Sequence, residues 1–392
     1  MLREYLCVAA QLGMAAILLL CSAACPALAD DAATIPPPEV RSTETTWPLF
    51  RGDSYATGVA ASTLPDQLEL LWRFEVPQGA FEATAVIFND TVFIGDLDGT
   101  LFALNLSDGT KVWEYKTKSG FPASPAYANG RIIVGDYDGN LHCVDAKNGE
   151  KQWIFTAGAE ISSSVNIHGE QILFGSQDAT LYCLNQNDGS LVWQRTLPDQ
   201  IRCLPTIAGG KCFVAGCDGS LHIINITDGE ESGSVPINAP TGVTPAVLGN
   251  MVYFGTEAGE IFGVNWQEPK AVWTHSDERG GQPIRSSAAV RDGLVVIGSR
   301  NKKILALDAQ TGDEKWTFAT RVRVDSAPVI VGERVFVGTA NGRLYAFKLS
   351  NGEMLWEYEA GGGFTGSPAV ASQRLVIAND RGVVYCFGKA TP

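Results

Sequence analysis

Histidine and cysteine are the residues of this chain that could support metal binding or nucleophilic catalysis. The four histidines, His142, His168, His222 and His275, are scattered, and His142 and His222 occupy equivalent positions of a repeat. No two of the nine cysteines have CxxC spacing. A zinc site and a catalytic triad each need several such groups to converge. The sequence therefore predicts neither a zinc site nor a catalytic residue.

Acidic turns of the form DxDG offer a second kind of chemistry, calcium binding. They occur at Asp96 and Asp98, at Asp136 and Asp138, and in reduced form at Asp218. A tight calcium site needs six to eight oxygen ligands, and these turns lack the further ligands. We interpret them as turns and expect no metal.

Six cysteines lie beyond the N-terminal segment: Cys143, Cys183, Cys203, Cys212, Cys217 and Cys386. Cys143, Cys183 and Cys386 stand at the same place in three repeats, where other repeats carry small or apolar residues, which predicts a buried core position. Cys203 and Cys212 lie on consecutive predicted strands. In an oxidising compartment they would form a disulfide or remain as free thiols, and the sequence leaves both open.

The elements that position these residues are copies of one repeat of about 40 residues. A tryptophan ends the corresponding segment of seven copies, and the eighth slot, at Gly233, holds none. The seven are Trp72, Trp113, Trp153, Trp193, Trp273, Trp316 and Trp356. There are therefore eight repeats, and we expect each indole to have a structural docking role.

Each repeat contains four short alternating segments separated by NG, DG or GG turns, which are typical of antiparallel β-hairpins. Four strands in about 40 residues are typical of one propeller blade. The predicted fold is all-β, an eight-bladed β-propeller of four-stranded blades. The chain begins with an isolated fourth strand around Trp72 and ends after a third strand around Cys386. The N-terminal strand should therefore close the ring, and trimming residues 66–76 should destabilise all of it.

The chain divides into four predicted parts. Residues 1–29 have the layout of a signal peptide, with an apolar run and a small-x-small site before Asp30. Residues 30–65 are a linker and lead-in, residues 66–387 the propeller, and residues 388–392 a tail. Lipoprotein processing at Cys25 is the alternative to cleavage after Ala29. In both cases we expect an exported, periplasmic or secreted protein that is not transmembrane after cleavage.

One position of the repeat, just before the first strand of each blade, holds a different type of residue in almost every copy, so the fold does not require a particular side chain there. We call these equivalent residues the variable column. It contains Glu82, Pro122, Ser162, Arg202, Gly242, Arg285, Asp325 and Thr365. An apolar residue precedes nearly every member, so alternation places the column on the face opposite the core, at the channel mouth. The candidate partner-binding residues are Glu82, Arg202, Arg285, Arg323 and Asp325. The alternative is that these charges pair with one another and fill the channel.

The Asp/Asn-Gly-x-x-x-Trp pattern, as in DGTKVW ending at Trp113, resembles the tryptophan-docking motif of quinoprotein-type propellers. The resemblance covers nearly all of the chain beyond the signal, and it implies that each indole packs between neighbouring blades. In the enzyme branch of that family, pyrroloquinoline quinone and calcium lie in the channel mouth. Those dehydrogenases are longer and several carry a vicinal Cys-Cys disulfide, which this chain lacks.

The plain blades and the length are closer to the outer-membrane assembly lipoprotein family of BamB, whose members bind a membrane-protein insertase and hold no cofactor. The segment from Val324 to Pro328 resembles the BamB loop whose acidic residues touch the partner, which carries that role to Asp325. Arg323 stands where BamB has a second acid, which weakens the transfer of the specific role.

A net charge of −14 argues against nucleic acid as a partner. The sequence thus favours a non-enzymatic, monomeric, exported scaffold that binds a protein and uses no cofactor. One alternative is the quinoprotein dehydrogenase. The other is a carbohydrate- or polymer-binding module, suggested by Trp47 and Trp266.

Overall fold

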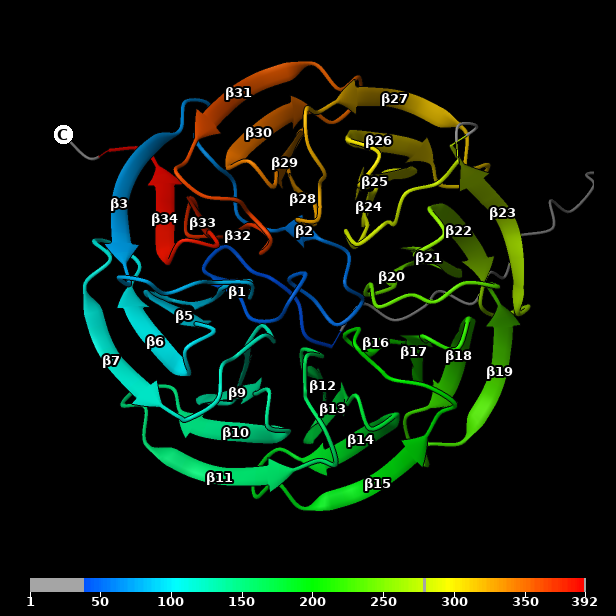
Figure 1. Ribbon diagram of the computed structural model, residues 1–392, viewed down its shortest axis with the longest axis horizontal. Helices are drawn as coiled ribbons and strands as arrows, with labels where there is room; N and C mark the ends of the chain where they lie inside the picture. Colours follow the sequence, from blue (N-terminus) through cyan, green and yellow to red (C-terminus); the bar gives the residue numbers. More distant parts are fainter. Residues whose placement is uncertain (1–38, 278–279, 391–392) are drawn as a thin grey trace, which may run out of the picture. The chain divides into compact units, whose positions relative to one another are not determined.

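The computed structural model describes residues 39–277 and 280–390, and these form a ring of eight sheets around a central channel (Figure 1). The described residues are all β-structure, turns and irregular segments. The predicted eight-bladed propeller is confirmed. Residues 1–38, which include the predicted signal peptide, Cys25 and Ala29, lie outside the described part.

Every blade has four antiparallel strands, ordered from the channel outward. Blades 1 to 4 comprise β4 (Val86–Phe88), β5 (Thr91–Gly95), β6 (Thr100–Asn105) and β7 (Lys111–Lys116); β8 (Ala126–Ala128), β9 (Arg131–Gly135), β10 (Asn140–Asp145) and β11 (Lys151–Thr156); β12 (Asn166–His168), β13 (Gln171–Gly175), β14 (Thr180–Asn185) and β15 (Leu191–Thr196); and β16 (Thr206–Ala208), β17 (Lys211–Ala215), β18 (Ser220–Asn225) and β19 (Glu231–Pro236). Blades 5 to 8 comprise β20 (Ala246–Leu248), β21 (Met251–Gly255), β22 (Glu260–Asn265) and β23 (Lys270–Ser276); β24 (Ala289–Arg291), β25 (Leu294–Ser299), β26 (Lys303–Asp308) and β27 (Glu314–Ala319); β28 (Val329–Val331), β29 (Arg334–Gly338), β30 (Arg343–Lys348) and β31 (Met354–Glu359); and β32 (Ala369–Ala371), β33 (Arg374–Ala378), β34 (Val383–Gly388) and β3 (Glu69–Glu75).

The burial of each strand follows from its place in the blade. The two middle strands lie between neighbouring blades, so both of their faces are covered, and β5 and β6 are runs of apolar residues. The outermost strand faces solvent, and β7 alternates exposed and covered side chains. The core is therefore a set of inter-blade layers.

Six of the seven tryptophans of the repeat, all but Trp356, connect their blade to the next. Six indole N–H groups donate to a backbone carbonyl of the following blade: Trp72 to Leu106, Trp113 to Ala146, Trp153 to Gln186, Trp193 to Ile226, Trp273 to Ala309 and Trp316 to Leu349, at 2.8–3.2 Å. Each ring also covers a turn glycine. Gly149 has φ +74°, and a Cβ there would lie 2.7 Å from the Trp113 ring. Only glycine meets both conditions.

The N-terminal strand closes the ring, as predicted. β3 pairs antiparallel with β34, and Trp72 lies opposite Cys386. Figure 1 shows β3 as the outermost strand of blade 8, beside the red C-terminal strand β34. This pairing covers the edge that β34 would otherwise expose.

Residues 39–65, which the sequence indicates only as lead-in, run through the centre of the ring (Figure 1). β1 (Thr46–Trp47) pairs with the innermost strand β4, and β2 (Val59–Ala60) pairs in parallel with β28. Backbone amides of further innermost strands donate to carbonyls of this segment: Tyr127 to Pro48, Ile207 to Ser54, Val247 to Tyr55, Val290 to Thr57 and Ile330 to Gly58. We call residues 39–65 the closing segment, because they seal one end of the channel.

Candidate functional site

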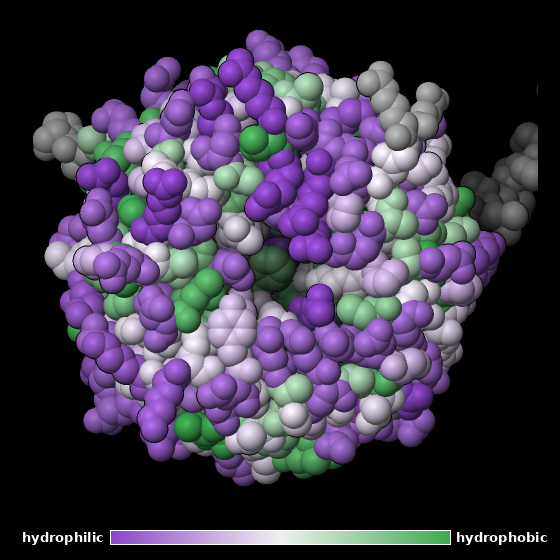
Figure 2. Space-filling view, in the orientation of Figure 1, coloured by the Kyte–Doolittle hydropathy of each residue, from purple (hydrophilic) through white to green (hydrophobic). Residues whose placement is uncertain are grey.

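The open end of the channel is a hollow of about 580 Å³, lined by residues of all eight blades, and we call it the channel mouth. Figure 2 shows it at the centre of the ring, with strongly hydrophilic residues gathered along one side. Phe50 of the closing segment also lines this hollow. All eight members of the variable column line the mouth: Glu82, Pro122, Ser162, Arg202, Gly242, Arg285, Asp325 and Thr365.

Below this column, hydroxyl groups link the blades. Six equivalent positions carry serine or threonine: Thr84, Ser124, Ser164, Thr244, Ser287 and Ser367. A backbone N–H of one blade donates to the hydroxyl of the next, as from Thr84 to Ser124 at 2.9 Å and from Ser367 to Thr84 at 2.9 Å. These buried bonds satisfy amides that a strand ladder cannot reach.

The two remaining positions, Leu204 and Ala327, have no hydroxyl. At both places another serine bridges the interface. Ser163 donates to the carbonyl of Cys203 at 2.7 Å, and Ser286 donates to the carbonyl of Ser326 at 3.2 Å. The ring around the mouth is thus held by polar contacts at every one of these blades, which makes the mouth a fixed frame.

An arginine pair holds Asp325. Arg300 donates to both carboxylate oxygens, at 2.7 and 2.8 Å, and Arg323 donates to one at 3.1 Å. The Asp325 side chain is 12% exposed whereas Arg323 is 59% exposed. Hydrogen bonding to Asp325 raises the pKa of Arg300. Bidentate pairing fixes the geometry of the carboxylate, so the surface offered to a partner is cationic.

Two more predicted arginines lie on the same side of the mouth. Arg285 donates to Glu257 at 3.0 Å, and Arg202 donates to the side chain of Gln200 at 2.8 Å. Both arginines are exposed. The alternative was that the arginines pair with Glu82 and Asp325 and fill the channel. Of these pairs the structure has Arg323 with Asp325, whereas Arg285 pairs with Glu257 and Arg202 with Gln200.

Glu82 belongs to a different, acidic side of the mouth. Burial and the neighbouring carboxylate of Glu160 raise the pKa of Glu82. Burial is also the main cause that raises the pKa of Tyr137, and the carboxylates of Glu82 and Glu160 raise it further. The mouth therefore has a basic side on blades 4 to 7 and an acidic side on blades 1 to 3.

The closed end of the channel contains two buried ionisable side chains of the closing segment, Arg51 and Asp53. Arg51 is 1% exposed and donates to the backbone carbonyls of Ala288 at 3.0 Å and Pro328 at 2.6 Å. Burial lowers the pKa of Arg51 to about 9 and raises the pKa of Asp53 to about 6. Asp53 accepts hydrogen bonds from the backbone amide and the hydroxyl of Thr57.

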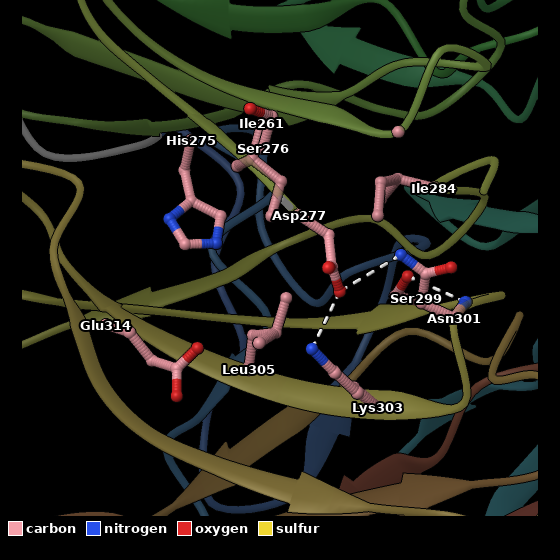
Figure 3. Close-up of a pocket in the computed structure, with 11 residues that line it drawn as sticks. Ile261, His275, Ser276, Asp277, Ile284, Ser299, Asn301, Lys303, Leu305 and Glu314 are labelled. Carbon is pink, nitrogen blue, oxygen red and sulfur yellow. Dashed lines mark hydrogen bonds and ion pairs between the residues drawn. The ribbon is translucent and has the colours of Figure 1, made fainter. Parts of the chain in front are cut away.

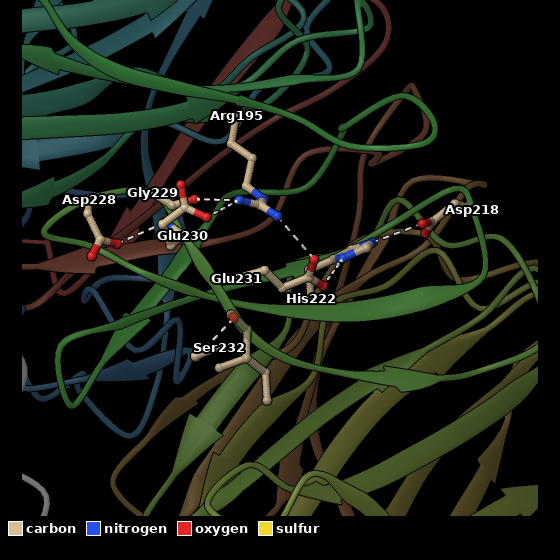
Figure 4. A network of polar contacts seen from close by, with 9 residues as sticks. Arg195, Asp218, His222, Asp228, Gly229, Glu230, Glu231 and Ser232 are labelled. Atoms are coloured by element: carbon tan, nitrogen blue, oxygen red, sulfur yellow. Dashed lines mark hydrogen bonds and ion pairs between the residues drawn. The ribbon is translucent and has the colours of Figure 1, made fainter.

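His222 and His142 each contact acidic side chains of their own blade. His222 lies between Asp218 and Glu231, both at 2.9 Å, and Arg195 of the preceding blade contacts Glu231 (Figure 4). His142 similarly contacts Asp136 at 2.8 Å. Among the described residues, no three His, Cys, Asp or Glu side chains are grouped to hold a metal ion.

Several other predictions concern single residues. The six described cysteines are free thiols, so Cys203 and Cys212 form no disulfide in this structure. Trp47 is fully buried, and Trp266 is partly buried against Phe213, so neither is the exposed aromatic platform that the carbohydrate-binding alternative needs. The part of the chain that the structure describes has no helix long and apolar enough to span a membrane.

Sequence reasoning missed Arg300, Glu257 and Arg51. Arg300 and Glu257 lie in the turns after the second strands, outside the column that was compared. A comparison of these turns would have found them, since other blades have Leu97 or Tyr137 there. Arg51 stands in a segment without a repeat, so no column contained it.

Comparison with known proteins matches three overlapping stretches, residues 58–200, 138–282 and 270–391, to the family model described as outer membrane protein assembly factor BamB. A curated BamB of Xanthomonas campestris pv. campestris is 31% identical over 91 residues, and the match spans 21% of this chain and 22% of that protein.

Solved structures share the fold at low identity. BamB from Moraxella catarrhalis aligns with a TM-score of 0.68 and 17% identity, covering 83% of this chain and 99% of that one. A quinohemoprotein alcohol dehydrogenase from Comamonas testosteroni aligns with a TM-score of 0.71 and 15% identity, covering 88% and 81%. Propellers alone do not separate a scaffold from an enzyme. The family match, which extends over nearly all of the described ring, does assign a family, and this chain belongs to the family of the outer membrane protein assembly factor BamB.

Proposed function

We propose that this protein is a non-enzymatic, exported scaffold that binds a protein partner during the assembly of outer-membrane proteins. Membership of the BamB family supports the assembly role. The candidate partner site is the basic side of the channel mouth, with Arg202, Arg285 and Arg323 as the contacting residues.

The observation that carries this proposal is the asymmetry of the channel. Its closing segment seals one end, while the other end presents exposed arginines that the repeat does not require. Arg323 and Arg285 are each oriented by one carboxylate. Their side chains nevertheless remain 59% and 50% exposed, respectively. Guanidinium groups held in this way recognise partner carboxylates with a defined geometry.

The roles of Glu82 and Asp325 differ in this proposal. Glu82 would contact a partner from the acidic side of the mouth. Asp325 would act through Arg300 and Arg323, because its oxygens already accept their hydrogen bonds. A partner contact through the Asp325 carboxylate itself would first have to displace these arginines.

The test is complementation of a deletion strain in the native host. Deletion should lower the amount of folded outer-membrane β-barrel proteins, and the wild-type gene should restore it. The double variant Arg202→Glu/Arg285→Glu should fail at a normal protein level. Arg73→Glu is the matched control, since Arg73 is 54% exposed on the outermost strand β3. Restoration by the double variant would contradict the mouth as the partner site.

The second candidate, a quinone- and calcium-dependent dehydrogenase, is favoured by the likeness in fold to the alcohol dehydrogenase. The mouth residues do not fit its cofactor site, because Asp325 is held by two arginines and, among the described residues, no three His, Cys, Asp or Glu side chains are grouped to hold a metal ion. Titration with pyrroloquinoline quinone plus calcium should give no saturable absorbance change. Dye-linked alcohol oxidation would overturn the scaffold proposal.

We further propose that the mature protein is a periplasmic monomer, released after Ala29 or lipid-anchored at Cys25. Intact mass of the purified envelope protein distinguishes the two, because lipidation at Cys25 adds acyl chains and retains residues 25–29. Light scattering measures the oligomeric state.

A further inference from the structure

The interfaces between blades are filled by a recurring pair of side chains. One member comes from the outermost strand, two residues after the tryptophan, and the other from the third strand of the next blade. Five interfaces hold a pair of rings: Phe74 and Phe102, Tyr115 and His142, Phe155 and Tyr182, Phe318 and Tyr345, and Tyr358 and Tyr385, with ring centroids 5.2–6.0 Å apart.

Three interfaces depart from this pattern. Their two positions hold Arg195 and His222 between blades 3 and 4, Val235 and Phe262 between blades 4 and 5, and His275 and Leu305 between blades 5 and 6. A pocket of about 340 Å³ lies at the interface of blades 5 and 6. This volume is within the usual range of small-molecule sites, which begins at about 300 Å³.

The lining of the pocket combines an apolar wall with a polar end (Figure 3). Ile261, Ile284 and Leu305, all buried, form the apolar part. At the polar end, Asp277 accepts hydrogen bonds from Lys303 at 2.7 Å and from Asn301 at 3.3 Å. Figure 3 shows the His275 ring facing Leu305, with the Asp277–Lys303 pair on one side and Glu314 on the other.

We propose that this pocket is a binding site for a small phenolic compound, a flat aromatic ring that carries a hydroxyl group. The ring would occupy the space that the chain itself fills with rings at five other interfaces. Aromatic rings gain from burial and from edge or stacked contacts with a neighbouring ring, which His275 provides. The hydroxyl would bond at the polar end, where the Lys303 ammonium has further N–H donors and the side chain is 36% exposed.

This site is separate from the channel mouth and from the proposed scaffold function. The pocket and the mouth have no lining residue in common. Loss of phenol binding would therefore leave the partner site unchanged, and failure of the scaffold proposal would leave the phenolic site standing.

The test is fluorine NMR of 4-fluorophenol titrated with the purified protein. We expect saturable line broadening for 4-fluorophenol and weaker broadening for fluorobenzene, which lacks the hydroxyl. Leu305→Tyr places at this interface the residue found at positions 182, 345 and 385. It should fill the pocket and weaken binding at least about tenfold.

Two further variants keep this test decisive. His275→Phe restores the other member of the ring pair and should also weaken binding. Thermal unfolding checks that both pocket-filling variants, Leu305→Tyr and His275→Phe, are folded, and we expect neither to melt below wild type. Tyr182→Phe, at the interface of blades 2 and 3, is the matched control and should bind as wild type does. Absence of saturable binding to folded wild-type protein, or undiminished binding in both filled variants, would overturn the proposal.

Discussion

The two ends of the channel are built from different kinds of sequence and do different things. The closed end is made by one non-repeating segment whose charges, Arg51 and Asp53, are almost completely buried. The mouth is made by eight equivalent positions, and its charges at Arg202, Arg285 and Arg323 remain exposed. Buried charges are held by the fold at a cost in desolvation, whereas exposed charges contribute little to stability. We infer that the closed end serves the ring and that the mouth serves a partner.

The largest expected effect is at the closed end. Arg51→Ala should lower the free energy of unfolding by about 3–5 kcal/mol, because it removes the partner of two buried carbonyls and leaves Asp53 without its nearby cation. Urea unfolding followed by tryptophan fluorescence measures the change. Arg323→Ala, the matched control at the mouth, should change it by less than about 1 kcal/mol. Equal effects would erase the distinction between the two ends.

The pH dependence of stability sharpens the same contrast. The pKa of Asp53 rises from 3.8 to about 6 in the folded protein, mainly through burial. The folded state therefore favours the protonated acid, and this contribution is complete below about pH 4 and lost as the pH rises through about 6. Asp53→Asn mimics the protonated acid, so it should be more stable than wild type by up to about 3 kcal/mol at pH 7.

The control for this experiment is the same comparison at pH 4. There the difference between wild type and Asp53→Asn should shrink to about 0.5 kcal/mol, because Asp53 is neutral in the folded chain and only about 60% ionised in the unfolded chain. A difference that does not vary between pH 4 and pH 7 would contradict the assignment.

A smaller effect is expected from the aspartate of the mouth. Asp325→Asn keeps the size of the side chain but removes the charge that Arg300 and Arg323 share. We expect a loss of about 1 kcal/mol in the free energy of unfolding, since both arginines remain partly hydrated. Denaturant titration measures it. A loss as large as that of Arg51→Ala would show that the mouth charges hold the ring together.

The smallest effect on stability belongs to the exposed arginines. Arg202→Glu/Arg285→Glu should shift the free energy of unfolding by no more than about 0.5 kcal/mol, as is usual for surface substitutions. Partner binding should weaken by about tenfold or more and should become less sensitive to salt. Calorimetry of the purified variant with its identified partner tests both.

The ring could be predicted from the sequence because the same pattern of strands and turns recurs in eight copies. The tryptophan slots, the turn glycines and the strand around Trp72 are each enough to place a blade, and the mouth column followed from the same register. Arg51 escaped because its role depends on the carbonyls of Ala288 and Pro328, which lie more than two hundred residues away in the chain. The pairing of Asp325 with Arg300 escaped for a related reason, since it joins the turn of one blade to the segment before the first strand of the next.

The pocket between blades 5 and 6 was partly visible in the sequence. Aligning the residues two after each tryptophan shows His275 and Arg195 among Phe74, Tyr115, Phe155, Phe318 and Tyr358. Only the structure shows that Leu305 is its opposite member, because the pairing crosses between blades.

Site-specific photocrosslinking in the native host is the most direct test of the contrast between the two ends. A photoreactive amino acid is placed singly at positions 202, 285 and 323 of the mouth and at positions 44 and 61, which are exposed in the closing segment. We predict a covalent adduct with one and the same envelope protein from the three mouth positions and none from positions 44 and 61. Adducts from the closing segment alone would contradict the mouth as the partner surface.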